Sequence, residues 1–125
     1  MRPLAELELD EERGVVLARL RGEIDLSNAE PMRLQMDEAV PNQAIGLIVD
    51  LTGVRYLDSS GIRMLFDIAR RLERRQQRLS TVIESGSPVH ELLAMVGALD
   101  RLGVEDSLEK AEMSIFVDSV LDEQG

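Results

Sequence analysis

Residues 4–21 alternate between apolar and charged positions on either side of a short polar break, which is typical of strands with one solvated face. The period of two runs through residues 4–10 and again through residues 15–21. On the expected inner face lie Ala5, Leu7, Leu9, Val16, Ala18 and Leu20. Only Glu-Glu-Arg-Gly separates the two runs, so we expect a β-hairpin whose second strand ends at the polar segment that begins with Gly22.

A helix is expected next, and Pro31 restricts where it can begin, because proline lacks the N–H that the fourth residue of a helix donates. With Ser27 as the N-cap, Pro31 would be that fourth residue. With Asn28 as the N-cap, Pro31 is third and no helical hydrogen bond is lost. We therefore expect Asn28 to cap this helix. Its expected buried stripe is Met32, Gln35 or Met36, Ala39 and Val40.

Residues 44–51 are apolar on both faces, as in a central strand that is covered on both sides, and this strand is expected to end near Tyr56. The next helix has the spacing of a half-buried helix, and a strand over residues 79–84 follows it. Ser87 as N-cap and Pro88 at the first helical position predict another helix, then a short strand near Val104 and a last helix from Ser107. The expected buried positions of the three helices are Ile62, Leu65, Ile68, Ala69 and Leu72; Val89, Leu92, Leu93 and Val96; and Met113, Phe116, Val117, Val120 and Leu121.

Strands that alternate with helices in this order predict an α/β fold. We expect a single domain over residues 1–125, with sheet and helices from about residue 3 to 122. Its mixed sheet should have four to five strands packed with about four helices.

Charge and composition narrow the functions that are compatible with this fold. With 24 acidic and 14 basic residues the net charge is −10, which opposes direct binding of nucleic acid. The basic run over residues 70–78 is expected to be a solvated helix face, with contact to an acidic partner as the alternative. The chain has no apolar run near the ~18 residues of a membrane span, so we expect a cytoplasmic protein. The absence of cysteine excludes disulfides but is compatible with any compartment.

The junction Asp58-Ser59-Ser60-Gly61 stands at a strand-to-helix corner, the position that faces ligands in open α/β sheets. The helix is expected to begin around Ser60–Gly61, with Asp58 or Ser59 as its cap. Gly61 would let another surface approach closely. A capped helix start alone would account for these residue types.

Four chemical interpretations compete with that structural one. A serine nucleophile needs a base, but His90 is the only histidine and Gly-x-Ser-x-Gly is absent, so no catalytic residue is expected. No phosphate-binding loop is present. Glu23, Asp25 and Asp58 could bind Mg²⁺, but nothing in their spacing requires it, so we expect neither metal nor cofactor. The remaining interpretation makes the serine the substrate of a kinase.

Residues 49–65, VDLTGVRYLDSSGIRML, resemble the signature of STAS domains, specifically those of the bacterial anti-sigma factor antagonists. Residues 20–33, LRGEIDLSNAEPMR, are similar to the family's Gly-Glu-Leu-Asp loop and the helix after it. Residues 85–104, SGSPVHELLAMVGALDRLGV, resemble its late Ser-Pro helix and terminal strand. The three segments stand in the family's order and cover nearly the whole chain.

The resemblance implies a partner-switching protein without catalytic activity. In the family, the unphosphorylated antagonist binds an anti-sigma factor, a serine kinase, and so frees a sigma factor. The kinase then phosphorylates the first serine of the pair, Ser59 here, with Ser60 as the second choice, and a phosphatase restores binding. Asp25 matches a position beside the acceptor. The expected partner-binding residues are Glu23, Asp25, Asp58, Ser59, Ser60, Gly61 and Arg63.

One residue departs from the family's pattern, since Arg63 stands where the family often has glycine, and this could alter which kinase fits. A STAS domain of another class is the alternative. It would be an accessory subunit of a lipid-transport ABC system, or a stressosome component, without switching at Ser59.

Overall fold

The computed structural model describes the backbone of residues 3–124 and the side-chain burial of residues 3–117. Five strands form one mixed sheet in the order β1-β2-β3-β4-β5, in which only the β1–β2 pair is antiparallel. The strands are β1 (Ala5–Glu12), β2 (Val15–Ile24), β3 (Gly46–Leu57), β4 (Arg78–Val82) and β5 (Val104–Glu105). The helices are α1 (Ala29–Ala39), α2 (Ser59–Arg74), α3 (Pro88–Met95) and α4 (Leu108–Gln124). The predicted α/β fold with a mixed sheet and four helices is confirmed.

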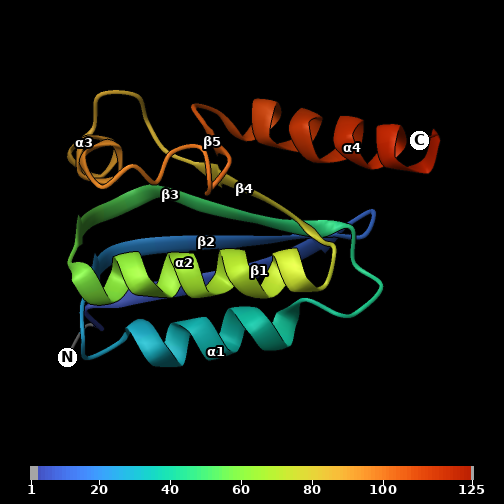
Figure 1. Ribbon diagram of the computed structural model, residues 1–125. Coiled ribbons are helices and arrows are strands. Elements are labelled where there is room, and N and C mark those ends of the chain that lie inside the picture. The colour runs from blue at the N-terminus through green and yellow to red at the C-terminus, as the bar shows by residue number, and fades with distance from the viewer. Residues whose placement is uncertain (1–2, 125) are drawn as a thin grey trace.

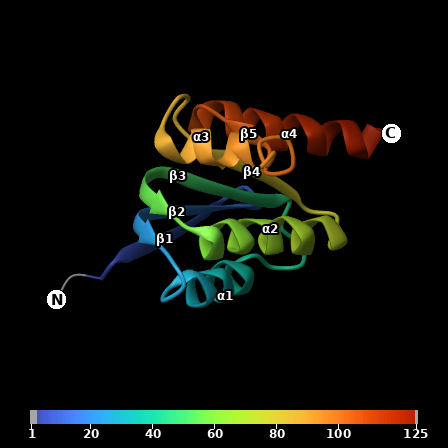
Figure 2. The same ribbon diagram turned by 60° about the vertical axis from the view of Figure 1, so that its left-hand side comes forward.

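Helices cover the sheet on both sides. Figure 1 shows α1 and α2 on one face of the sheet and α3 and α4 on the other, and Figure 2 shows the same three layers from the side. The larger core cluster joins the inner positions of β2 and β3 to α1, α2 and α3. A smaller cluster packs α4 against the sheet and contains Val15, Ile48, Val82, Ala111 and Ile115. Burial on both faces explains why the first four residues of β3, Gly46–Val49, are all apolar.

The predicted hairpin is confirmed, and its turn uses two residues with positive φ, Arg13 (φ 55°) and Gly14 (φ 82°), as tight β-hairpins require. The end predicted for its second strand is wrong. Strand β2 continues through Gly22 and Glu23 to Ile24, because these residues pair in parallel with the last residues of β3. That pairing depends on a segment thirty residues further along the chain, which the local polarity of residues 22–24 does not reveal. Glu23 therefore lies in a strand and not in a loop.

Several predicted buried positions differ from the structure. On β1, Leu9 is 42% exposed because this strand forms the edge of the sheet. On α1 the buried residue is Met36 and not Gln35, and on α2 Met64 is buried whereas Ile62 is half-buried. The basic run is exposed at Arg70, Arg71 and Arg74, as expected, but Gln77 is buried and donates hydrogen bonds to backbone carbonyl groups of the α1–β3 loop.

The predicted faces of the last two helices are also partly wrong. Val89 and Leu93 of α3 are buried, but Val96 follows the end of this helix and is exposed. The face of α4 was misassigned: Ala111 and Ile115 are buried and Phe116 is half-buried, whereas Met113 and Val117 are exposed. Apolar residues occur on several sides of α4, so its sequence supports more than one buried face. The side chains of Val120 and Leu121 lie outside the described residues.

Among the described residues, no helix combines the length and the apolar character needed to cross a membrane.

Candidate functional site

The carboxyl ends of β2 and β3 lie side by side and bring two loops together. Ile24 pairs with Leu57 in the parallel register, and the backbone N–H of Asp58 donates to the carbonyl oxygen of Ile24 over 3.2 Å. Figure 1 shows that α1 and α2 both begin at this end of the sheet. The β2–α1 loop and the first turn of α2 therefore share one edge, as expected at the carboxyl ends of parallel strands.

The first turn of α2 is capped by Asp58. Its Oδ1 accepts hydrogen bonds from the backbone N–H groups of Ser60 (2.8 Å) and Gly61 (3.2 Å), which satisfies two of the donors that a helix start leaves unpaired. The helix consequently begins at Ser59, one residue earlier than predicted. Ser59 is exposed, whereas Ser60 is half-buried. Asp58 is thus the cap, and Ser59 presents its hydroxyl to solvent.

The β2–α1 loop is held by its own polar side chains. Asn28 is the N-cap residue of α1, as predicted, and Pro31 is the third helical residue. The Asn28 amide does not cap the helix, however; it accepts from the N–H of Asp25 (3.0 Å) and donates to the carbonyl oxygen of Glu23 (2.9 Å). The Asp25 carboxylate accepts from the N–H of Ser27 (2.9 Å) and from its hydroxyl.

These bonds leave one apolar side chain projecting from the loop. Leu26 is 83% exposed, although its neighbours in the loop are polar. A single exposed leucine is common on protein surfaces and does not by itself mark a contact; Leu26 belongs to the candidate site because it lines the same hollow as Ser59 and Ser60. Sequence reasoning missed this residue, although an apolar side chain inside the polar segment Asp-Leu-Ser-Asn was a usable signal.

A hollow of about 280 Å³ lies between this loop and the starts of α1 and α2. We call it the serine hollow. Its lining residues are Leu26, Ala29, Glu30, Ser59, Ser60, Arg63, Met64 and Asp67. Of the seven residues predicted for the site, the hollow contains Ser59, Ser60 and Arg63, and Asp58 adjoins it as the helix cap. Glu23, paired with Tyr56 inside the sheet, and Asp25, bonded to its own loop, do not line it.

Gly61 has a structural role that differs from the predicted one. The residue is buried, and a Cβ atom there would lie 2.2 Å from Leu57 Cδ1 and 3.2 Å from Ile24 Cγ2. Glycine is needed because α2 packs directly against the ends of β2 and β3. Gly61 therefore sets the depth at which α2 lies, and with it the position of the two serines.

The alternatives of a serine nucleophile and a carboxylate metal site find little support in this geometry. His90 lines a different hollow, together with Glu105 and Lys110, and not the serine hollow. In the part of the chain that the structure describes, no group of three or more His, Cys, Asp or Glu residues is placed to hold a metal ion.

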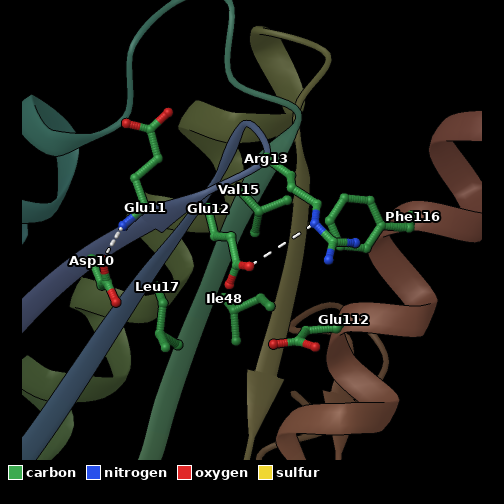
Figure 3. Close-up of a pocket in the computed structure, with 9 residues that line it drawn as sticks. All are labelled: Asp10, Glu11, Glu12, Arg13, Val15, Leu17, Ile48, Glu112 and Phe116. Carbon is green, nitrogen blue, oxygen red and sulfur yellow. Dashed lines mark hydrogen bonds and ion pairs between the residues drawn. The ribbon is translucent and has the colours of Figure 1, made fainter.

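A separate hollow of about 100 Å³ lies at the opposite end of the sheet, between the β1–β2 turn and α4. Figure 3 shows its apolar floor of Val15, Leu17 and Ile48, with Glu12 of the hairpin and Glu112 of α4 beside it. Arg13 extends across it toward Phe116 and forms a 3.9 Å ion pair with Glu12. None of the predicted site residues lines this hollow.

Comparison with known proteins places the fold and the site in context. The STAS domain family profile matches residues 6–111. The anti-sigma F factor antagonist of Paenibacillus polymyxa is 29% identical over 103 residues, which cover 82% of this chain and 87% of that protein.

Three solved structures have the same fold. The crystal structure of an anti-sigma factor antagonist from Mycobacterium paratuberculosis has a TM-score of 0.78 at 19% identity and covers 89% of this chain and 93% of its own. The unphosphorylated form of the anti-sigma factor antagonist SpoIIAA has a TM-score of 0.64 at 23% identity, covering 87% of this chain and 96% of its own. The structure of Bacillus SpoIIAA in its phosphorylated form has a TM-score of 0.65 at 23% identity, covering 87% of this chain and 97% of its own.

Proposed function

This chain belongs to the STAS domain family, and from that premise we propose that it is an anti-sigma factor antagonist regulated by phosphorylation of Ser59. The unphosphorylated chain binds an anti-sigma factor with serine kinase activity and thereby frees a sigma factor. Phosphorylation by that kinase ends the binding, and a phosphatase restores it, all in the cytoplasm. The name of the Paenibacillus polymyxa relative, an anti-sigma F factor antagonist, supports this role.

The observation that carries the proposal is the exposed hydroxyl at the first residue of α2. Ser59 stands at the rim of the serine hollow, beside the exposed side chain of Leu26. Asp58 fixes the backbone on either side of it through the N–H groups of Ser60 and Gly61. A rigid, accessible hydroxyl suits a kinase acceptor. The half-buried Ser60 is the poorer acceptor of the two.

A phosphate at this position would change the surface in a simple way. It adds about −1.5 to −2 charges at neutral pH, next to the carboxylate of Asp58 and the apolar side chains of Leu26 and Met64. An interface fitted to a neutral hydroxyl would then contain an anion that is repelled and that loses its hydration. A loss of ~3 kcal/mol in binding free energy raises the dissociation constant more than a hundredfold.

The experiment is phosphorylation by the anti-sigma factor kinase encoded in the same genome. With that kinase and ATP, we expect a mass gain of one phosphate that maps to Ser59. Ser59→Ala should abolish the gain, and Ser60→Ala is the matched control that should keep it. Phosphate on the Ser59→Ala chain would contradict the assignment. No phosphate at all, together with co-purification of membrane ATPase subunits, would favour an accessory subunit of a lipid-transport ABC system, and assembly into a large complex would favour a stressosome component.

A further inference from the structure

Ser59 and Arg63 form a ridge between two hollows on the surface of α2. One is the serine hollow. The second, which we call the arginine groove, is lined by Ser59, Ile62, Arg63, Phe66, Arg70 and Arg101. Both residues of the ridge line both hollows. Their spacing of i and i+4 places the two side chains next to each other on one helix face, where oppositely charged groups attract.

The arginine groove concentrates positive charge in a chain whose net charge is −10. Two of its three arginines already have partners. Arg70 forms an ion pair with Asp67, and Arg101 lies 5.8 Å from the centre of the Phe66 ring and 3.8 Å from Glu73 Oε2. The Arg63 guanidinium has no ion pair or hydrogen bond among the described residues, and it is exposed. It is therefore the cation of the groove that is available to a new anion.

We propose that the arginine groove receives the phosphate of phosphorylated Ser59 and that Arg63 is its principal ligand, with Arg101 as a second. This inference rests on the proposed function for the source of the phosphate. In the kinase reaction, the bond between the γ-phosphorus of ATP and the bridging oxygen breaks, and a bond from that phosphorus to Ser59 Oγ forms. ADP leaves, and the hydroxyl proton passes to a base of the kinase.

The groove gives phosphorylation a second effect on the binding surface. A guanidinium forms strong, charge-assisted hydrogen bonds with phosphate oxygens. In the unphosphorylated chain Arg63 is free to bind a carboxylate of the kinase partner, whereas in the phosphorylated chain it binds the phosphate. The modification thus adds an anion to the interface and removes a cation from it. The carboxylate of Asp58 and the start of α2 also act on the phosphate, but they are the same in every Arg63 variant.

The test uses chains in which phosphoserine is incorporated at position 59 during synthesis, so that no kinase is required. The second ionisation of the phosphate is followed by ³¹P NMR as the pH is changed. The ordinary pKa of this ionisation is about 6, and a bound arginine lowers it. We expect Arg63→Gln to raise this pKa by about 0.2–0.4 units, and Arg101→Gln to raise it by less. Arg63→Lys should restore most of the lowering.

Arg74→Gln is the matched control, because it removes the same charge from an exposed position of the same helix. Fifteen residues of helix put Arg74 about 22 Å from Ser59, beyond the screening length of about 8 Å at physiological salt, so the pKa should not change. An equal phosphate pKa in the Arg63→Gln and unsubstituted chains would overturn the proposal that the arginine groove binds the phosphate. A kinase that does not phosphorylate Ser59 would instead refute the proposed function, and the NMR result for the groove would stand.

Discussion

The backbone N–H of Asp58 donates a hydrogen bond to the carbonyl oxygen of Ile24, with 3.2 Å between nitrogen and oxygen. This bond extends the pairing of β2 and β3 by one residue beyond the last paired residues, Ile24 and Leu57. It joins the segment that caps α2 to the strand that leads into the β2–α1 loop. The exposed hydroxyl of Ser59 and the exposed side chain of Leu26 are therefore held in a fixed position relative to each other.

The cap of α2 predicts the effect of replacing Asp58. Asp58→Ala removes the acceptor for the N–H groups of Ser60 and Gly61, and we expect it to lower the free energy of unfolding by about 1 kcal/mol. Asp58→Asn keeps a side-chain oxygen at the cap and should retain most of this stability. Urea denaturation of both variants checks the prediction. An alanine variant with the same midpoint as the unsubstituted chain would show that the cap contributes nothing.

The close contact at Gly61 predicts an unusual sign for a common substitution. In a helix, Gly→Ala normally stabilises by up to about 1 kcal/mol. Here the new Cβ would lie 2.2 Å from Leu57 Cδ1 and 2.9 Å from Leu57 Cγ, so we expect Gly61→Ala to destabilise the chain by about 1–3 kcal/mol.

A double-mutant cycle with Leu57→Ala tests the cause of this effect. Removing the leucine side chain makes room for the Cβ, so the double variant should be less destabilised than the sum of the two single variants. Thermal or urea unfolding gives the three free energies. Strict additivity, or a stabilised Gly61→Ala chain, would contradict the packing that we describe.

The exposed Leu26 predicts a loss of binding without a loss of stability. Leu26 is 83% exposed at the rim of the serine hollow, so Leu26→Ala should change the unfolding free energy by less than about 0.5 kcal/mol. Its removal should weaken binding of the kinase partner about tenfold, as for an apolar anchor at an interface. Met95, also 83% exposed but on α3, is the matched control. Calorimetry should find Met95→Ala unchanged in affinity, and equal effects of the two variants would argue against a contact at Leu26.

Phosphorylation should act locally. The start of a helix tolerates a phosphate, and neither the Asp58 cap nor the packing of Gly61 uses the Ser59 hydroxyl. Amide NMR spectra of the two forms should therefore differ around the serine hollow and the arginine groove and agree across the sheet. Shift changes spread through β3 and β4 would show a rearrangement of the fold instead.

Glu30 and Asp37 of α1 share Arg33 as an ion-pair partner. We nevertheless expect them to change the stability of the fold in opposite directions as the pH falls. The hydrogen bond from Arg33 lowers the pKa of Glu30. Burial raises the pKa of Asp37, and the nearby Arg71 and Arg33 offset this only in part. As the pH falls, the stabilisation from Glu30 is lost through its lowered pKa. The folded chain holds the Asp37 proton more tightly than the unfolded chain, so Asp37 favours folding as the pH falls through its raised pKa.

Carboxyl ¹³C NMR titration measures both groups directly. In the unsubstituted chain the Asp37 carboxyl should titrate above the usual range for aspartate and the Glu30 carboxyl below that for glutamate. Arg33→Gln should raise both pKa values, because each carboxylate loses an attractive charge. A lowered Asp37 pKa in the unsubstituted chain would mean that its ion pairs outweigh its burial.

Local signals in the sequence predicted much of the fold. The alternation on either side of the hairpin, the uniformly apolar run in β3 and the Ser87-Pro88 helix start each depend on residues close together in the chain. The position of Pro31 likewise predicted the correct start of α1.

Features that depend on distant segments were not predictable in this way. The extension of β2 to Ile24 depends on pairing with β3, and the buried face of α4 depends on what the sheet presents to it. Within the candidate site, Asp-Ser-Ser-Gly predicted the capped strand-to-helix corner, and the family resemblance added the hypothesis that Ser59 is the acceptor. The packing partner of Gly61, the inward bonds of Asp25 and the exposure of Leu26 arise only when the chain is folded.

The hydrogen bond between Asp58 and Ile24 affects which form of the chain a modifying enzyme can recognise. The loop with Leu26 and the helix start with Ser59 are separated by the whole of α1 and β3 in the chain, and they become neighbours only after the parallel crossover has closed. A short synthetic peptide around Ser59 would have the same local sequence but would lack the adjacent loop with Leu26. Recognition would then be conformational, and unfolded or nascent copies of the chain would escape modification until they had reached their native shape.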